Sequence, residues 1–248
     1  NNKNYLRSLA AKLKSEVIDH NNFIGGRYSV LSEVGMLPAI LMGLKVDKFR
    51  KFNQLIKNNF FLNSIVNSVS NTISLTKKNK KNSVILNYDE HSSDLFYWYQ
   101  QLIAESLGKK NKGILPVVSK MPQDNHSLMQ FYLDGAKNNF YTFYFTKEIF
   151  SQKIKNQGLL ESHIYLKNKN LQNVLFEQFI ATQNVFKKKN IPFRSFVVEK
   201  RDESTLGTLF TYFILETILL GKALKINPYN QPSVELIKKE TKKRLIKN

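Results

Sequence analysis

Short apolar segments of strand length alternate along this chain with longer segments of helical periodicity. The four candidate strands are residues 83–88, 114–118, 140–145 and 193–198. The longest helical segments beside them are residues 94–107, 171–189 and 205–220. This alternation favours parallel βαβ units, in which helices cover both faces of a sheet. We therefore expect an α/β fold, a three-layer sandwich with a mainly parallel sheet, and an active site at the carboxyl ends of its strands.

Helical periodicity also occurs in three segments before the first strand, in one between the second and third strands, and in one near the carboxyl terminus. The further candidate helices are residues 32–44, 48–63, 64–75, 127–135 and 233–245. Pro38 is expected to interrupt the first of these preceding helices. The segment 205–220 is almost entirely apolar and is expected to be buried. The polar run 77–82 is the best candidate for a domain boundary, and it is also short enough to be a loop.

Composition narrows the chemistry that this chain can perform. With 248 residues and 42% hydrophobic content it can fill a sizeable core. It contains no cysteine, which excludes disulfides, thiolate metal sites and a cysteine nucleophile. No apolar run approaches the ~18 residues of a membrane span, and the first residues are polar and basic rather than typical of an export signal. We therefore expect a cytoplasmic globular protein that does not contact a membrane.

The formal net charge of +19 raises nucleic acid or an anionic membrane as a partner. Only six of the 38 basic residues are Arg, however, whereas proteins that read phosphates and bases favour the bidentate fork of Arg. The many Lys residues occur with abundant Asn and Ile, which is typical of a genome-wide bias. A solvated basic surface is the favoured interpretation, and such a field would also concentrate an anionic substrate.

Two clusters in the first half of the chain carry candidate functional groups. Arg27 directly follows Gly25-Gly26, two residues that can take positive φ and could aim a fixed cation into a cleft. A turn with a surface Arg is the plain alternative. Glu105 lies one turn before a predicted helix end, a position that is unfavourable for the helix dipole and so calls for another reason. An exposed Glu beside a Lys would fit the same pattern.

Two further clusters lie downstream. His126 is at a predicted helix start, where Asp124 or Asn125 could instead serve simply as a helix cap. Gln231 and Lys238 are seven residues apart at the start of the last helix, so that two helical turns would bring them to roughly one face. As a pattern alone, this segment is also a helix start with surface charges. None of the four clusters matches a metal, nucleotide or catalytic-triad pattern.

Together the clusters resemble the signatures of the glucose-6-phosphate isomerase family. Residues 25–29 with Val34-Gly35 are similar to its first signature, and residues 227–238 are similar to its second, including the Gln-x-x-Val-Glu-x-x-Lys core. The matches between them, in the family's order, are Tyr88-Asp89, Gln100-Gln101, Glu105-Ser106-x-Gly108-Lys109 and His126-Ser127. The resemblance runs from near residue 5 to about residue 245. It departs from the family at Ser233, where the second signature has Gly, and in the loop 121–125.

The resemblance implies roles for particular residues in an aldose-ketose isomerase. Glu105 would move a proton from C2 to C1 of the open-chain sugar through a cis-enediol, and Arg27 would stabilise the negative charge of the enediolate. His126 and Lys238 would open the sugar ring. The substrate-binding positions would be Gln231 and Gly26. The family needs no metal or organic cofactor, and its His comes from the partner subunit, so the resemblance also implies a homodimer.

The family has two sugar-isomerase (SIS) domains, and the first carries a Ser/Thr-rich loop that holds the sugar phosphate. No such loop precedes Gly25, and the sequence opens without Met, so we expect most of the first domain to be absent. The predicted divisions are a tail of the first SIS domain (1–30), connecting helices (31–82), the second SIS domain (83–226) and an active-site turn and helix (227–248).

The function implied for the complete protein is interconversion of glucose 6-phosphate and fructose 6-phosphate in glycolysis and gluconeogenesis. Three alternatives remain open at this point. The chain by itself could be an inactive fragment, because it lacks the phosphate loop. It could be a sugar-phosphate-binding SIS module without catalysis, although a sensor has no need of Glu105, His126 and Lys238 together. A basic nucleic-acid-binding domain is the alternative suggested by the charge.

Overall fold

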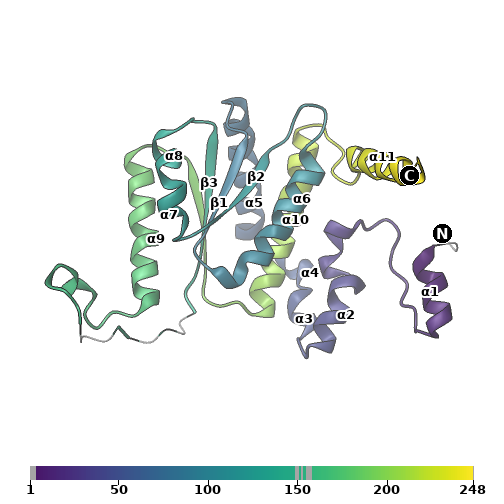
Figure 1. Ribbon diagram of the computed structural model, residues 1–248, viewed down its shortest axis with the longest axis horizontal. Helices are drawn as coiled ribbons and strands as arrows, with labels where there is room; N and C mark the ends of the chain where they lie inside the picture. The colour runs from purple at the N-terminus through teal and green to yellow at the C-terminus, as the bar shows by residue number, and fades with distance from the viewer. Residues whose placement is uncertain (1–3, 149–150, 152, 155–157, 248) are drawn as a thin grey trace.

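The computed structural model describes residues 4–148, 151, 153–154 and 158–247. A four-stranded sheet forms the middle layer of the structure (Figure 1). Its strands are β1 (Asn82–Asn87), β2 (Leu115–Lys120), β3 (Asn139–Thr146) and β4 (Phe193–Val198). Their order across the sheet is β2-β1-β3-β4, and every neighbouring pair is parallel. The predicted α/β fold with a parallel sheet is confirmed.

Helices cover both faces of the sheet (Figure 1). One face carries α5 (Asn59–Lys77), α6 (Ser93–Leu107) and α10 (Glu203–Ala223). The other carries α7 (Asp124–Ser127), α8 (Met129–Asp134) and α9 (Leu171–Lys188). Each face has its own hydrophobic core, one centred on α6 and α10 and the other on α9. The three-layer arrangement therefore follows from the βαβ alternation of the sequence.

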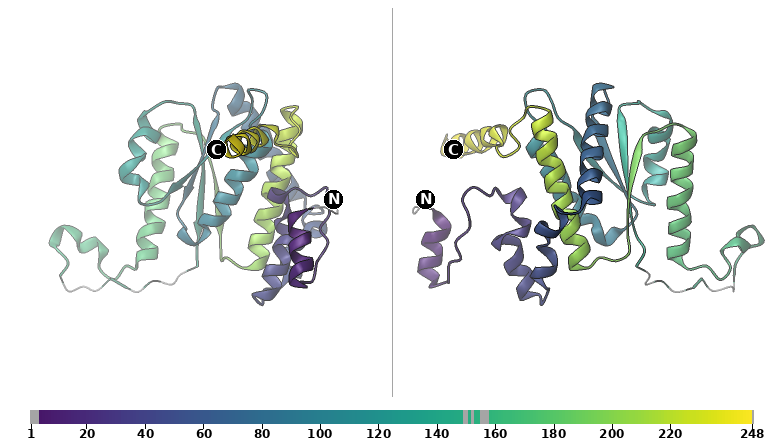
Figure 2. Two further views of the ribbon diagram at one scale, coloured as in Figure 1. Left: turned by 45° about the vertical axis from the view of Figure 1, so that its right-hand side comes forward. Right: turned by 180° about the vertical axis from the view of Figure 1, so that it is seen from behind.

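The remaining helices lie outside the three layers. Three of them, α2 (Glu33–Leu41), α3 (Val46–Phe49) and α4 (Phe52–Leu55), precede α5, and both α3 and α4 contact α10. The two end helices, α1 (Tyr5–Leu13) and α11 (Pro232–Lys247), stand away from the body on the same side of the molecule (Figures 1 and 2). Short 3-10 segments form at η1 (Gly26–Leu31), η2 (Glu90–Ser92) and η3 (Glu161–Leu166).

Strand β3 shows how coverage from both sides shapes the core. Five of its eight residues are aromatic and three are polar, and all eight are buried because helices lie on both faces. Phe143 packs edge-on against Phe179 and Phe186 of α9, with ring centroids 5.9 and 5.2 Å apart. Tyr144 points to the opposite side, where it packs against Phe96 of α6 at 4.8 Å. Alternating strand residues thus join the sheet to both helix layers.

Helix α10 is the central helix of its layer. By length and hydropathy it could cross a membrane, but half of that apolar stretch is buried in the protein, as expected for a core helix. The sequence prediction that this segment is buried is therefore confirmed. Gly207 lets α3 approach closely, because a Cβ at this position would lie 2.3 Å from the carbonyl oxygen of Phe49. Any larger residue at position 207 would push the two helices apart.

Several predicted boundaries differ from those in the structure. Residues 48–63 do not form one helix, since the backbone leaves the helical region at Arg50 between α3 and α4, and α5 then starts at Asn59. This break lets Phe49 turn into a small core with Met36 and Ala39. Helical propensity is weak enough for such burial to override it.

Two other boundary predictions are also wrong. Pro38 does not interrupt α2, because burial of Met36 and Ala39 on either side of it holds the helix together. The helix expected in residues 127–135 starts earlier, as α7, and breaks at Leu128 before α8. The polar run 77–82 is the end of α5 and the turn into β1. The division of the chain into four segments stays a prediction, and residues 1–3 and 248 of its outer segments lie outside the described residues.

Asp202 caps the amino end of α10, which yields a testable prediction. Its side chain accepts the backbone N–H of Thr205 at 2.8 Å, and this hydrogen bond lowers the pKa of Asp202 to about 2. A carboxylate with a lowered folded-state pKa stabilises the fold above the unfolded-state pKa of about 3.9, and this contribution is lost as the pH falls towards 2. Asp202→Ala should therefore cost about 1 kcal/mol at pH 7.

Thermal unfolding at several pH values checks this prediction. The gap in melting temperature between parent and Asp202→Ala should stay constant from pH 7 to about 5 and shrink below about pH 4. Asp202→Asn is the matched control, because Asn caps helices equally well and does not titrate. A gap that persisted undiminished at the lowest pH would show that the ionised carboxylate is not the stabilising group.

Candidate functional site

The segment 25–28 brings Arg27 into the interior of the protein. Gly25 has extended backbone (φ −70°), and neither it nor Gly26 has positive φ, so the reason that the sequence suggested for these glycines is wrong. Both glycines are exposed, and no atom lies within 4 Å of where a Cβ would be. What Gly provides here is open space above the backbone rather than an unusual dihedral angle. The 3-10 segment η1 then turns the Arg27 side chain inward.

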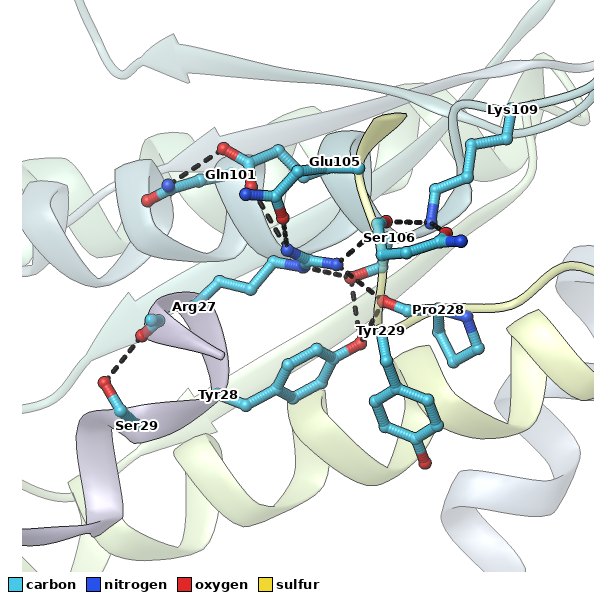
Figure 3. A network of polar contacts seen from close by, with 12 residues as sticks. Arg27, Tyr28, Ser29, Gln101, Glu105, Ser106, Lys109, Pro228 and Tyr229 are labelled. Atoms are coloured by element: carbon cyan, nitrogen blue, oxygen red, sulfur yellow. Dashed lines mark hydrogen bonds and ion pairs between the residues drawn. The ribbon is translucent and has the colours of Figure 1, made fainter. Parts of the chain in front are cut away.

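Arg27 is 4% exposed, and all five of its N–H groups have acceptors (Figure 3). Nε donates to Ser106 at 2.8 Å, and Nη1 donates to Glu105 at 3.3 Å and to the side chain of Gln231. Nη2 donates to the carbonyl oxygens of Pro228 at 2.7 Å and Asn230 at 3.3 Å. One guanidinium thus joins three segments that are far apart in the sequence. We call Arg27, Glu105, Ser106 and residues 228–231 the arginine cluster.

Glu105 is held between two partners close to the end of α6. One carboxylate oxygen accepts the Gln101 side-chain amide at 3.0 Å, and the other accepts Arg27 (Figure 3). Its side chain remains 25% exposed, so the carboxylate is fixed in position while one side stays open to solvent. A carboxylate that is anchored and accessible has the geometry of a general base.

Ser106 and Tyr28 continue the network to the carboxyl-terminal turn. Arg27 donates to Ser106 Oγ, which lies 2.8 Å from the Tyr28 hydroxyl, and Tyr28 donates to the carbonyl of Pro228 at 3.2 Å. With one proton on each hydroxyl, Ser106 must therefore donate to Tyr28. Burial raises the pKa of Tyr28, which keeps its phenol protonated as this arrangement requires.

The turn 227–231 also receives a lysine. Lys109 donates its Nζ protons to the carbonyl of Asn227 at 2.6 Å and to both the carbonyl and the side chain of Asn230. Burial and the neighbouring Arg27 charge lower the pKa of Lys109. Neither Lys109 nor Ser106 was among the predicted site residues, although both lie in the motif around Glu105. Side-chain chemistry alone gave no sign that Lys109 would bind backbone carbonyls.

Gln231 is part of the arginine cluster, whereas Lys238 is not in direct contact with it. Gln231 precedes α11 rather than lying within it, so the two residues are not placed by two regular turns of one helix. Lys238 is exposed and pairs with Glu235 at 2.8 Å. This hydrogen bond raises the pKa of Lys238, and the charge of Glu105 adds to the effect. Lys238 therefore lies within the electrostatic field of the carboxylate.

His126 lies away from the other predicted site residues. It is exposed in α7, which is on the opposite face of the sheet from α6 (Figure 1). The sequence predicted that His126 lies at the start of a helix, but it is the third residue of α7. The turn before it is held by Asp124, which accepts the backbone N–H of Lys120 and the Ser119 hydroxyl, both at 2.8 Å. Within one chain, no contact among the described residues brings His126 to Glu105.

Metal-binding side chains do not gather at this site. Among the described residues, no group of three or more His, Asp or Glu side chains could hold a metal ion. The fixed charges of the site are Arg27, Lys109, Lys238 and Glu105. Such a set can bind an anionic polar ligand and move a proton at a carboxylate.

Comparison with known proteins finds relatives that are similar in sequence to this chain. The family model described as phosphoglucose isomerase matches residues 10–121, which include Arg27 and Glu105. A glucose-6-phosphate isomerase of Mycoplasmopsis pulmonis is 36% identical over 222 residues, covering 87% of this chain and 52% of that protein. One from Methanocaldococcus jannaschii is 30% identical over 247 residues, covering 92% of this chain and 59% of that protein. The chain therefore spans little more than half the length of these relatives.

Solved structures share the fold. A hypothetical protein of Thermus thermophilus superposes with a TM-score of 0.87 at 25% identity, over 97% of this chain and 60% of that one. A glucose-6-phosphate isomerase of Chlamydia trachomatis superposes with a TM-score of 0.70 at 18% identity, over 94% of this chain and half of that one, which shows the fold alone. The parallel four-stranded sheet flanked by helices is thus a fold that both solved structures share with this chain.

The contacts of the arginine cluster predict that Arg27 holds the carboxyl-terminal turn in place. Arg27→Ala removes the hydrogen bonds that Arg27 donates to the carbonyls of Pro228 and Asn230, and leaves only Tyr28 and Lys109 as their donors. Each hydrogen bond from a charged group contributes about 1.5–3 kcal/mol to stability. Amides of residues 229–231 should then exchange with solvent at least about tenfold faster. Arg7→Ala, which breaks only an exposed pair with Asp19, is the control. Unchanged exchange in residues 229–231 would contradict the role given to Arg27.

Proposed function

We propose that this chain, a homologue of the phosphoglucose isomerases, forms about half of a glucose-6-phosphate isomerase and supplies its proton-transfer residues. The observation that carries the proposal is the convergence of Arg27, Glu105 and Gln231 from three distant segments into one partly open cluster. Each of these residues lies in a motif that resembles the family. The complete protein would interconvert glucose 6-phosphate and fructose 6-phosphate in the cytoplasm.

Glu105 is the proposed base. In the open-chain sugar, the proton on C2 is acidified by the neighbouring C1 aldehyde, and a carboxylate within hydrogen-bond reach can remove it. The electrons move to form the cis-enediolate, with negative charge on the C1 oxygen. A proton then passes from the C2 hydroxyl to the C1 oxygen, and Glu105 returns its proton to C1, so that C2 becomes the ketone carbonyl. The hydrogen bond from Gln101 and the ion pair with Arg27 would keep the carboxylate oriented through both transfers.

Arg27 would stabilise the enediolate mainly through its fixed charge. All five of its N–H groups already have protein acceptors, so direct donation to the substrate would require it to give up one of them. A buried cation next to the base lowers the energy of negative charge that develops on the sugar oxygens and needs no reorganisation at that moment. Gln231, which is held by Arg27, is suited to position the substrate, and the open space above Gly26 could admit it.

The remaining predicted groups fit a complete, dimeric enzyme. Lys238 has an exposed ammonium group within the field of Glu105 and could assist ring opening. His126 is remote from Glu105 within the chain, so it could act there only from a second subunit, which is why we propose a homodimer. The groups that bind the phosphate would belong to the part of the relatives that this chain does not span.

The base assignment is tested in the complete protein that contains this chain. Glu105→Gln removes the proton acceptor but keeps the hydrogen-bonding shape, so kcat should fall by about 10²–10⁴-fold. The matched control is Glu177→Gln, at an exposed position on α9, and it should retain the parent rate. A coupled assay of fructose 6-phosphate conversion measures both. If Glu105→Gln isomerised at the parent rate, Glu105 would not be the base.

A second prediction concerns residues 1–248 alone. Without the half that would bind the phosphate, this chain should show no measurable isomerisation, whereas the complete protein should be active. Both are produced in a host that lacks its own isomerase, and the Glu105→Gln form of the chain controls for residual contamination. Isomerisation by the 248-residue chain that disappears on Glu105→Gln would show that the chain already contains a complete site.

A further inference from the structure

Lys109 connects the two ends of the carboxyl-terminal turn, residues 227–231. At one end its ammonium group donates to the carbonyl of Asn227 at 2.6 Å. At the other end it donates to the carbonyl of Asn230 and to the side chain of the same residue at 3.0 Å (Figure 3). An ammonium group has three N–H donors, so these three acceptors use all of them. Among the described residues, no other side chain donates to both ends of this turn.

The first residues of the turn have other contacts, but these do not reach α6. Tyr229 donates its backbone N–H to the side chain of Asn227 at 2.9 Å, a hydrogen bond within the turn itself. Pro228 packs against Gly221 of α10, where an added Cβ would lie 3.0 Å from the proline side chain. Among the described residues, Lys109 alone holds Asn227 by a hydrogen bond from outside the turn. The attachment of this end of the turn to α6 therefore depends on one lysine.

The end of α6 carries both Lys109 and the proposed base. The N–H of Gly108 closes the last helical turn by donating to the carbonyl of Ala104 at 2.9 Å. A Cβ at Gly108 would lie 2.7 Å from that same oxygen, so glycine is what lets the chain turn this tightly. Glu105 lies just before this bend and Lys109 just after it. The proposed base and the lysine that holds the carboxyl-terminal turn thus share one short piece of backbone.

Two cations meet at the far end of the turn. Arg27 and Lys109 both donate to the carbonyl of Asn230, and Arg27 also holds the side chain of Gln231. Burial lowers the pKa of Lys109, and the charge of Arg27 adds to this effect, so the ammonium group lies here at an electrostatic cost. In return, the residue next to Gln231 is held from two sides. A lysine on an open surface would bear no such cost.

We propose that Lys109 is a positioning residue, which holds residues 227–231 against the end of α6 and so sets where Gln231 meets the substrate relative to Glu105. The inference rests on the proposed function, which assigns substrate contact to Gln231 and proton transfer to Glu105. Lys109 itself needs no contact with the sugar, because the turn uses its three donors. A displacement of the turn by about 1 Å is enough to lower the rate about a hundredfold.

Kinetics of the complete protein test this role. Lys109→Ala should lower kcat for fructose 6-phosphate about ten- to hundredfold, because the reacting carbons are no longer aligned with the base. KM should change less than about twofold, since the half that would bind the phosphate is unaltered. An unchanged kcat would overturn the proposal.

Lys112→Ala is the matched control. Lys112 lies in the same loop and also donates to a backbone carbonyl, that of Leu224 at 3.2 Å, so its removal deletes the same charge without releasing the turn. This variant should keep the parent kcat and KM. An equal loss of kcat in Lys109→Ala and Lys112→Ala would show that positive charge in this loop matters rather than the position of the turn, and would contradict the proposal.

A double-mutant cycle separates positioning from a general structural role. If Lys109 acts through Gln231, then Lys109→Ala should lower kcat less than about twofold once Gln231→Ala is already present. A lysine that only supports the fold would give losses that multiply, because its effect would not pass through Gln231. Multiplied losses would therefore rule the proposal out.

Amide exchange in the complete protein tests the same contact without any measurement of activity. Amides of residues 229–231 should exchange at least about tenfold faster in Lys109→Ala and at the parent rate in Lys112→Ala. Parent-like exchange in Lys109→Ala would overturn the inference even in an active isomerase. A complete protein without isomerase activity would instead overturn the proposed function, and the exchange rates would still decide whether Lys109 holds the turn.

Discussion

The arginine cluster is the interaction on which the geometry of the candidate site depends. A buried guanidinium without partners is costly, so the protein must supply acceptors for all five N–H groups of Arg27. It draws them from α6 and from a turn about 200 residues further along the chain. Satisfying one charge therefore fixes the distance between the carboxylate of Glu105 and the start of α11. The last helix itself is exposed and has little other attachment to the body (Figure 1).

Arg194 plays the corresponding structural part on β4. It ties β4 to β3, α5, α6 and α10 through five hydrogen bonds, two of them to the buried Glu216. Both arginines have acceptors for all five of their N–H groups, yet the carboxylates that they pair with differ in exposure. Arg27 shares its charge with a carboxylate that remains partly open to solvent, whereas the carboxylate paired with Arg194 is closed off. Accessibility of the acidic partner separates a candidate catalytic pair from a structural one.

Sequence reasoning succeeded where local pattern controls structure and failed where packing overrides it. The four strands and the helices α6, α9 and α10 follow from periodicity and from stop signals such as Gly108. The break at Arg50 does not, because it serves the burial of Phe49 beneath Gly207 of α10, more than 150 residues away. The continuous α2 across Pro38 is the converse case, in which burial preserves a helix that propensity would end.

By itself, the sequence determined the α/β class, the parallel sheet and the set of residue types available for proton transfer, because these depend on periodicity, length and the absence of cysteine. The tertiary structure decided which of those residues meet. It brought Arg27, Glu105 and Gln231 together, added Lys109 and left His126 on the opposite face of the sheet. Such outcomes depend on contacts between distant segments, which spacing along the chain does not encode.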